Sequence, residues 1–446
     1  MLRPRAAVLS ICVLAVCLLA VPAQGAVSPH SLRKPVTDEN FYFVMADRFE
    51  NGDAANDHGG IAGGRLQDGF DPTAKGFYHG GDLQGLLERI DYIKGLGTDS
   101  IWLTPSFKNK AVQLEDGPSA GYHGYWIIDF TQIDPHLGTN ADLRALVDAA
   151  HARGMKVYFD IITNHTADVI DYAQGQYGYV DQATKPYKDA AGNAFDPHTY
   201  AGTDSFPTMD AATSFPYTPV IKPEDAHVKV PDWLNDPTLY HNRGNSTYSG
   251  ESTTYGDFSG LDDLMTENPA VVNGFVDVYD QWVDLGIDGF RIDTAKHVNF
   301  EFWEQWSTQV LDYAHDHGKP DFFMFGEVYD ADPVKLSPYV RDTDMNSVLD
   351  FTFQSSAVSY AAGNSAKGLQ SLYAGDDWYL VDVNAPAPQK FVTGPAQIAK
   401  TAGDRSKILM GTNWHSNSQG QFVVAVVYMS SPAYSVCRRV AARPRA

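Results

Sequence analysis

Two acidic residues, Asp293 and Glu327, stand where carboxylates can do chemistry, because each ends a short apolar run of the chain. Such a pair suits the cleavage of a glycosidic bond. The oxocarbenium-like transition state needs one carboxylate at the anomeric carbon and one protonated carboxyl at the leaving oxygen. Either residue taken alone is equally well explained as a cap on the helix that follows a strand.

The spacing of the two acids, about 30 residues, fits one strand, one helix and the next strand of a parallel α/β unit. Parallel strands end at the same edge of a sheet, so both acids should lie on one rim. From residue 40 onward, short β-rich runs alternate with amphipathic stretches, which is typical of a parallel sheet wrapped by helices. We expect strands at 41–46, 100–103, 156–161, 289–292 and 322–325, and helices at 83–96, 140–153, 269–285 and 300–317.

One long stretch, 166–258, breaks this rhythm, since it is rich in Tyr, Asp, Pro, Gly and Thr and has no sustained apolar period. A long insertion after a barrel strand usually forms a loop-rich subdomain over the active face. We therefore expect the following division: a first part of a catalytic barrel at 26–165, an inserted domain at 166–258, a second part of the barrel at 259–380, and an atypical C-terminal segment at 381–446.

Residues 1–25 have the pattern of a secretory signal peptide, with a basic start, an apolar stretch and small residues at a cleavage site. No later stretch is long and apolar enough to span a bilayer. We therefore expect a secreted, extracellular protein without membrane contact after signal removal, although a retained anchor is the alternative. Cys12 and Cys17 lie in the signal, so Cys437 alone would remain and no internal disulfide could form.

Composition narrows the class of partner. The 446 residues carry a formal net charge of −22 and a pI near 4.9. Binding to nucleic acid needs clustered Lys and Arg, which this chain lacks, so we exclude a nucleic-acid partner. A neutral substrate fits the charge better than an anionic one, and we expect a monomer.

Four segments together resemble the α-amylase family of retaining α-glucoside hydrolases and transglycosylases. They are DIITNH at 160–165, GLDDL at 260–264, GFRIDTAKH at 289–297 and FGE at 325–327, in the family's order and spacing. The likeness covers residues 40 to about 380. It implies a (β/α)8 barrel of the TIM type with a loop-rich inserted domain after the third strand.

The resemblance also implies roles for individual residues. Asp293 matches the nucleophile and Glu327 the general acid/base of a retaining double displacement. Arg291 lies two residues before the nucleophile, on the same strand face, where its charge can keep a carboxylate ionised. His165 matches a histidine that contacts the sugar being cleaved, and Asp160 matches a strand-end carboxylate that supports the site.

The segment YHGYW at 122–126 is similar to another familiar segment of these enzymes. The similarity implies that Tyr125 stacks on the sugar ring at the cleavage point and that His123 forms a hydrogen bond with it. Lys296 and His297 match positions on the leaving-group side, with Lys296 expected to contact sugar.

Two calcium sites are implied, because calcium prefers carboxylate, amide and carbonyl oxygens. Asn164, Asp263 and the main-chain carbonyl of His297 match a family site between barrel and inserted domain. An N-terminal loop resembles one of cyclodextrin-forming members and would place six residues around a second ion: Asn51, Asp53, Asn56, Asp57, Gly80 and Asp82. A turn rich in Asn and Asp without metal is the alternative reading of this loop.

The chain departs from the family pattern after Glu327. The family uses a third carboxylate, an Asp directly after a His, but His415 is followed by Ser416 and no His-Asp pair occurs there. The possible stand-ins lack the right context: Asp376, Asp377, Asp382 and Asp404. The seventh and eighth barrel strands are also not evident, which leaves open whether the last barrel units are complete. The basic end of the chain is either a solvated tail or the product of a changed reading frame.

We therefore expect a secreted glycoside hydrolase that cleaves internal α-1,4 bonds of starch-like glucans, with Ca2+ as its cofactor. One alternative is a cyclodextrin-forming or transferring glucanotransferase, which the N-terminal loop favours. Another is an inactive carbohydrate-binding remnant without the third catalytic carboxylate.

Overall fold

The computed structural model describes residues 41–114, 117–349, 351–368 and 408–409. Its framework is one parallel sheet of seven strands in the order β1-β2-β7-β12-β13-β14-β15. These strands are β1 (Phe41–Val44), β2 (Ser100–Leu103), β7 (Lys156–Ile161), β12 (Gly289–Ile292), β13 (Phe323–Gly326), β14 (Ser347–Leu349) and β15 (Ile408–Leu409). Because all of them run in the same direction, their carboxyl ends meet at one rim.

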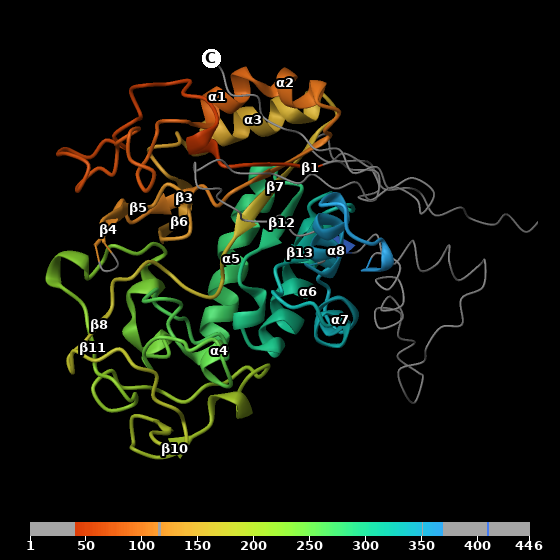
Figure 1. Ribbon diagram of the computed structural model, residues 1–446. Coiled ribbons are helices and arrows are strands. Elements are labelled where there is room, and N and C mark those ends of the chain that lie inside the picture. Colours follow the sequence, from red (N-terminus) through yellow and green to blue (C-terminus); the bar gives the residue numbers. More distant parts are fainter. Residues whose placement is uncertain (1–40, 115–116, 350, 369–407, 410–446) are drawn as a thin grey trace, which may run out of the picture.

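Helices cover the outside of this sheet (Figure 1). They are α1 (Leu83–Glu88), α2 (Ile90–Gly95), α3 (Asn140–Ala152), α5 (Pro269–Leu285), α6 (Phe300–Asp316), α7 (Pro333–Arg341) and α8 (Phe351–Ala361). The sequence sets their ends. Thr139 and Asp142 form a capping box at the start of α3, and Asn268 caps α5, whose first residue is a proline.

Both faces of the sheet are buried, which explains why its strands are apolar throughout rather than alternating. The outer face packs against the helices, where Trp282, Trp303 and Trp306 are among the largest fully buried side chains. The opposite face carries a separate cluster made of Phe43, Trp102, Tyr158, Phe323, Phe325 and Leu349. A curled parallel sheet with a filled interior of this kind is typical of a barrel.

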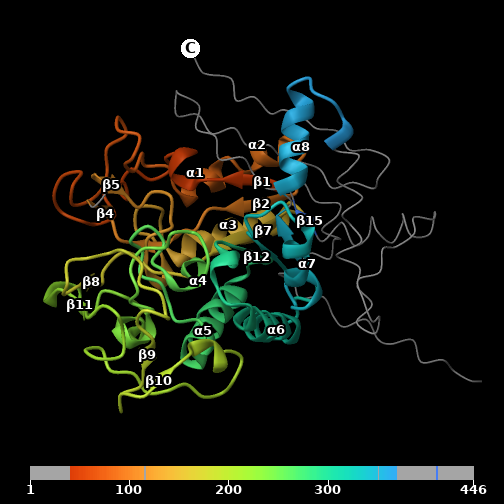
Figure 2. The ribbon, with the colours of Figure 1, turned by 60° about the horizontal axis from the view of Figure 1, so that its bottom comes forward.

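The chain between β7 and α5 forms a loop-rich body, yellow to green at the lower left of Figures 1 and 2. It contains only short elements: β8 (Asp171–Tyr172), β9 (Tyr187–Lys188), β10 (Ala194–Phe195), β11 (Pro219–Val220) and α4 (Ser252–Tyr255). The connection between β2 and α3 holds two small antiparallel pairs, β3 (Phe107–Asn109) with β6 (Ile127–Ile133) and β4 (Val112–Gln113) with β5 (Ser119–Ala120). Single 3-10 turns lie at Ala46–Arg48, Pro197–Thr199, Pro223–Asp225, Asp232–Asn235, Pro237–Leu239 and Ala295–His297.

Most of the predicted elements are confirmed. The strands at 100–103, 156–161 and 289–292 and the helix at 269–285 have the predicted bounds. The helix expected at 83–96 is two helices that meet at Arg89, and the strand expected at 41–46 ends at Val44 because a 3-10 turn starts two residues later. Sequence patterns did not identify β14, α7, α8 or β15.

Several predictions fall outside the described residues. They concern the signal at 1–25, Cys437, His415 and the stand-in aspartates between 376 and 404. Within the described part of the chain, no helix combines the length and apolar character needed to cross a membrane.

Candidate active site

Arg291 is the centre of the site and binds three carboxylates. Its Nη1 lies 2.8 Å from Asp160 Oδ1 and 2.6 Å from Asp293 Oδ1, and its Nη2 lies 3.0 Å from Glu327 Oε2. Sheet register explains the grouping, because Arg291 pairs with Asp160 on β7 and with Phe325 on β13, two residues before Glu327. Three adjacent strands thus deliver their acids to one guanidinium, which is 1% exposed.

Main-chain bonds fix the two predicted catalytic acids just beyond the strand ends. The Asp293 amide donates to the Ile161 carbonyl at 2.8 Å, and the Glu327 amide donates to the Ile292 carbonyl at 2.7 Å. The Thr294 amide donates to Glu327 Oε2 at 3.3 Å, and Thr294 has a left-handed backbone with φ of 51°. A threonine in this conformation is strained, and such strain is often found at functional sites.

Burial and charge set the protonation of the cluster. Burial raises the pKa of Glu327, although Arg291 opposes the shift. Burial likewise raises the pKa of Asp160 to about 7. Burial alone would lower the pKa of Arg291, but Asp160, Glu327 and Asp293 raise it well above its usual value, so it remains charged. The arrangement favours one carboxyl that holds a proton, as a general acid requires.

A cleft of about 590 Å³ opens above these acids. The following residues line it: Gln113, Gly117, Ser119, His123, Tyr125, Trp126, His165, Asp168, Phe258, Ser259, Leu261, Arg291, Asp293, Thr294 and Glu327. The floor is therefore charged, while rings and hydroxyl groups form the walls. A cleft of this composition suits a neutral polyhydroxylated ligand, whose ring faces pack on aromatic rings and whose hydroxyl groups find hydrogen-bond partners.

Rings predicted to contact sugar lie in the cleft. Tyr125 stacks on His123 with ring centroids 5.7 Å apart, and its hydroxyl donates to Asp160 Oδ2 at 3.3 Å. His165 stacks on Phe258 at 5.6 Å, and its Nε2 is buried without a hydrogen-bond partner. Burial lowers the pKa of His123 to about 4 and that of His165 to about 3, so both imidazoles are neutral near pH 7.

Three predicted site residues lie outside this lining. Asp160 is fully buried below the cleft. It can affect a ligand indirectly, by its hydrogen bonds with Arg291 and Tyr125. Lys296 donates from Nζ to the Tyr329 carbonyl at 3.0 Å, and His297 donates from Nδ1 to the Thr253 carbonyl at 2.9 Å.

Sequence reasoning missed part of the cleft wall. Phe258, Ser259 and Asp168 were not singled out, although the first two directly precede the GLDDL segment. Trp102 was not among the predicted site residues, yet its Nε1 donates to Asp160 Oδ2 at 3.0 Å. Proximity to the GLDDL motif is the sequence signal for Phe258 and Ser259. Only the sheet register, which pairs β2 with β7, indicates the contact between Trp102 and Asp160.

The first predicted calcium set is partly assembled. The Leu264 amide donates to the Asn164 carbonyl at 2.9 Å, which places Asn164 beside Asp263, and the two segments also pair between His165 and Asp263. Asn164 Oδ1 is buried without a donor, so an acceptor suited to a cation is available there. Asp263 Oδ2 accepts a bond of 2.6 Å from His241 Nδ1.

The second predicted set lies together in the N-terminal loop. Asp82 accepts from the Gly52, Asp53 and Gly85 amides, so its oxygens already organise the loop and cap α1. Asn51 donates to Asp57 Oδ1 at 2.7 Å. Asn56 Oδ1 is buried without a partner, and a Cβ on Gly80 would lie 2.6 Å from Asp57 Oδ1. Within the described ranges, no group of three or more His, Cys, Asp or Glu side chains has a metal-binding arrangement. Both predicted sets combine carboxylates with amide or carbonyl oxygens, and they stay predictions.

Comparison with known proteins defines the class. The family model "Alpha amylase, catalytic domain" matches residues 43–383. An α-amylase of Streptomyces lividans is 52% identical over 367 residues, covering 81% of this chain and 40% of that protein. A cyclomaltodextrin glucanotransferase of Klebsiella oxytoca is 28% identical, covering 77% of this chain and 48% of that protein. The crystal structure of an Anoxybacillus α-amylase superposes with a TM-score of 0.54 at 30% identity, over 77% of this chain and 59% of that one.

The chain therefore belongs to the α-amylase catalytic-domain family, as its motifs predicted. The (β/α)8 fold class is also confirmed, since the family's catalytic domain has that fold and the described parallel sheet agrees with it. The chain spans less than two thirds of the length of each relative described above.

Proposed function

We propose that this protein is a secreted glycoside hydrolase that cleaves internal α-1,4 bonds of starch-like glucans with retention of configuration. The proposal rests on one observation: Arg291 forms ion pairs with both Asp293 and Glu327 at the floor of an open cleft. The identity of 52% to an α-amylase, against 28% to a glucanotransferase, favours hydrolysis over transfer.

The geometry supports a double displacement. Glu327, with its pKa raised by burial, donates its proton to the leaving glycosidic oxygen, while an Asp293 oxygen attacks the anomeric carbon. The glycosidic bond breaks and a covalent glycosyl-aspartate forms. Glu327, now ionised, takes a proton from water, whose oxygen attacks the anomeric carbon and releases Asp293. Arg291 stabilises both carboxylates in their ionised states.

Other parts of the proposal rest on sequence patterns. Tyr125 and His123 would hold the sugar at the cleavage point, His165 would bond it, and Lys296 and His297 would serve the leaving-group side. Residues 1–25 would direct secretion, and the stretch 166–258 would be the inserted domain of the proposed division. The unpartnered Asn164 Oδ1 supports a calcium ion beside Asp263, where the ion would hold the inserted segment against the sheet.

One observation favours a second candidate, a carbohydrate-binding protein without turnover. The chain has no His-Asp pair after Glu327, and Asp168, Asp293 and Glu327 are the carboxylates among the described residues that line the cleft. Loss of one transition-state contact costs about 100- to 1000-fold in rate, by analogy with lost oxyanion donors.

Release of reducing ends from soluble starch tests the proposal. We expect release by the wild-type protein and none by Asp293→Asn, which lacks the attacking carboxylate. Asp316→Asn, which changes an exposed acid on α6, is the matched control and should match wild type. Starch binding without release would establish the second candidate, and cyclic products would establish a glucanotransferase.

A further inference from the structure

A buried lysine lies outside the acid cluster in the loop-rich body. Lys229 is 2% exposed, and its Nζ lies 2.6 Å from Asp262 Oδ2 and 3.1 Å from the Tyr240 hydroxyl. Tyr240 in turn donates to the Leu234 carbonyl at 2.6 Å. A charged pair removed from water in this way is costly, so its presence here calls for an explanation.

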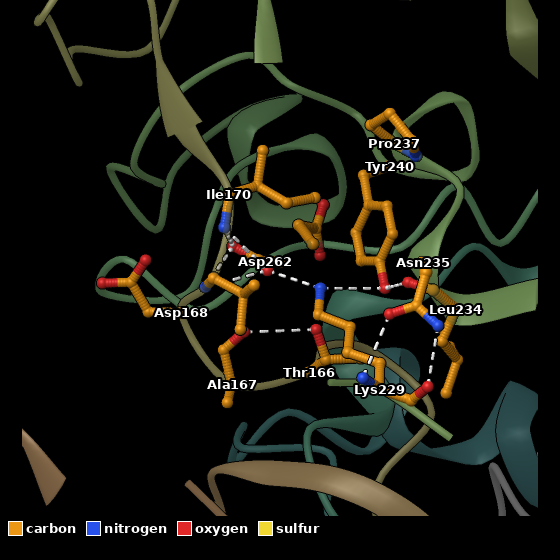
Figure 3. Close-up of polar contacts among 12 residues, drawn as sticks. Thr166, Ala167, Asp168, Ile170, Lys229, Leu234, Asn235, Pro237, Tyr240 and Asp262 are labelled. Atoms are coloured by element: carbon orange, nitrogen blue, oxygen red, sulfur yellow. Dashed lines mark hydrogen bonds and ion pairs between the residues drawn. The ribbon is translucent and has the colours of Figure 1, made fainter. Parts of the chain in front are cut away.

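The partners of Asp262 show what the pair joins. Its carboxylate accepts from the Val169 amide at 3.1 Å and from the Ile170 amide at 3.1 Å, and its carbonyl accepts from the Thr166 amide at 3.1 Å. Figure 3 shows the Lys229 ammonium between Asp262 and Tyr240. The network thus connects three segments: the one that leaves β7, the one at 229–240 in the loop-rich body, and the one that returns to α5.

Two of these segments form cleft wall. Asp168 directly precedes Val169, and Leu261 directly precedes Asp262; both line the cleft, as do Phe258 and His165. The Asp168 side chain points away from the network (Figure 3). A shift of the Asp262 carboxylate would therefore move two stretches of wall at once.

We propose that Lys229 is a positioning residue, which holds Asp262 so that the wall stretches 165–168 and 258–261 keep the spacing that a glucan chain needs. The proposal rests on the proposed function for its ligand, but its structural part can be tested without sugar. Lys229 touches no substrate in this scheme, since it acts through Asp262 and the amides that Asp262 binds.

The test compares Lys229→Met with a matched buried lysine. Lys319 is 5% exposed and donates from Nζ to the Ile287 carbonyl at 2.8 Å, near the amino ends of the strands and far from the cleft rim. Hydrogen exchange of peptides covering 165–170 and 258–262 is measured first. We expect exchange at least about tenfold faster there in Lys229→Met and unchanged exchange there in Lys319→Met; equal exchange in Lys229→Met and wild type would overturn the proposal.

Affinity for maltoheptaose is measured by calorimetry in an Asp293→Asn background, which prevents turnover. We expect Kd to rise about tenfold with Lys229→Met, because misplacement of a binding wall by about 1 Å is costly, and to stay within twofold with Lys319→Met. If Lys229→Met does not fold, the double variant Lys229→Met/Asp262→Asn replaces it, since it leaves no unpaired buried charge. The double variant should also show fast exchange and weak binding; restored protection and affinity would mean that Lys229 only neutralises Asp262, and would overturn the proposal. A parent that binds no maltoheptaose refutes the proposed function, and the exchange comparison then decides the proposal alone.

Discussion

At the scale of single residues, the proposed mechanism depends on one guanidinium that binds three carboxylates. Burial raises the pKa of Glu327, while Asp293 is held at 2.6 Å by Arg291. In the proposed mechanism, two chemically similar groups would thereby receive opposite roles from their surroundings. The fully buried Asp160 shares Nη1 of Arg291 with Asp293 and accepts a hydrogen bond from the Tyr125 hydroxyl.

The pH profile tests this division. A general acid must carry its proton, so kcat/KM should fall as the pH rises through the raised pKa of Glu327. Glu327→Gln should lower kcat/KM on starch by about 100- to 10,000-fold. The loss of kcat/KM in Glu327→Gln should be much smaller on an aryl maltoside, whose leaving group needs no proton. Rates measured on both substrates from pH 4 to about 9 give the comparison; a basic limb that persists unchanged in Glu327→Gln would assign it to another group.

At the scale of elements, the YHGYW segment is held by contact with the loop after β2. Gly124 has φ of 91°, and a Cβ there would lie 1.8 Å from the Pro105 carbonyl oxygen. Its amide also donates to the Gly121 carbonyl at 2.9 Å. Only glycine permits this approach, which places His123 and Tyr125 on the cleft wall.

We expect Gly124→Ala to destabilise the fold by about 2 kcal/mol or more and to weaken maltoheptaose binding, because backbone strain of about 1 to 3 kcal/mol adds to a clash with main chain. Gly154→Ala is the control, since Gly154 has φ of 68° but nothing within 4 Å of the new Cβ. It should lose about 1 kcal/mol from strain alone and leave binding unchanged. Urea unfolding and calorimetry measure both effects; equal losses in the two variants would exclude the clash.

Elements also show how far sequence reasoning reaches. Strands buried on both faces, such as β7 and β12, are short continuous apolar runs that a sequence reveals, and acids at their ends follow from register. The wall formed by Phe258 and Ser259 depends on long-range packing of a segment without periodicity, so the sequence indicates it only through the GLDDL motif that directly follows. β15 was missed for a related reason, because it has only two described residues in a stretch without apolar rhythm.

At the scale of the whole molecule, the loop-rich body and the sheet meet where Asn164 lies beside Asp263. An interaction that stabilises this junction also stabilises the cleft wall, because His165, which lines the cleft, directly follows Asn164. A calcium ion there would couple global stability to the shape of the site, since a ligand that binds the native state alone stabilises it by mass action.

We expect calcium at 100 times its Kd to raise the free energy of unfolding by about 2.7 kcal/mol, and a chelator to remove the increment. Asn164→Ala should abolish the calcium-dependent increment, whereas Asn193→Ala, at an exposed amide near β10, should preserve it. Unfolding followed by circular dichroism with and without calcium measures the difference. Loss of the increment in Asp82→Asn but not in Asn164→Ala would assign the ion to the N-terminal loop instead.

The count of charges around Arg291 has a consequence for the choice of substrate. With Glu327 protonated, as the proposed mechanism requires, Asp160 and Asp293 against one guanidinium leave at most one negative charge at the cleft floor. A neutral glucose polymer enters this field without repulsion, but a phosphate ester or a uronic acid close to the scissile bond would be repelled. The charge at the floor thus disfavours anionic sugars, and phosphorylated starch should be cleaved between its modified residues and left intact next to them.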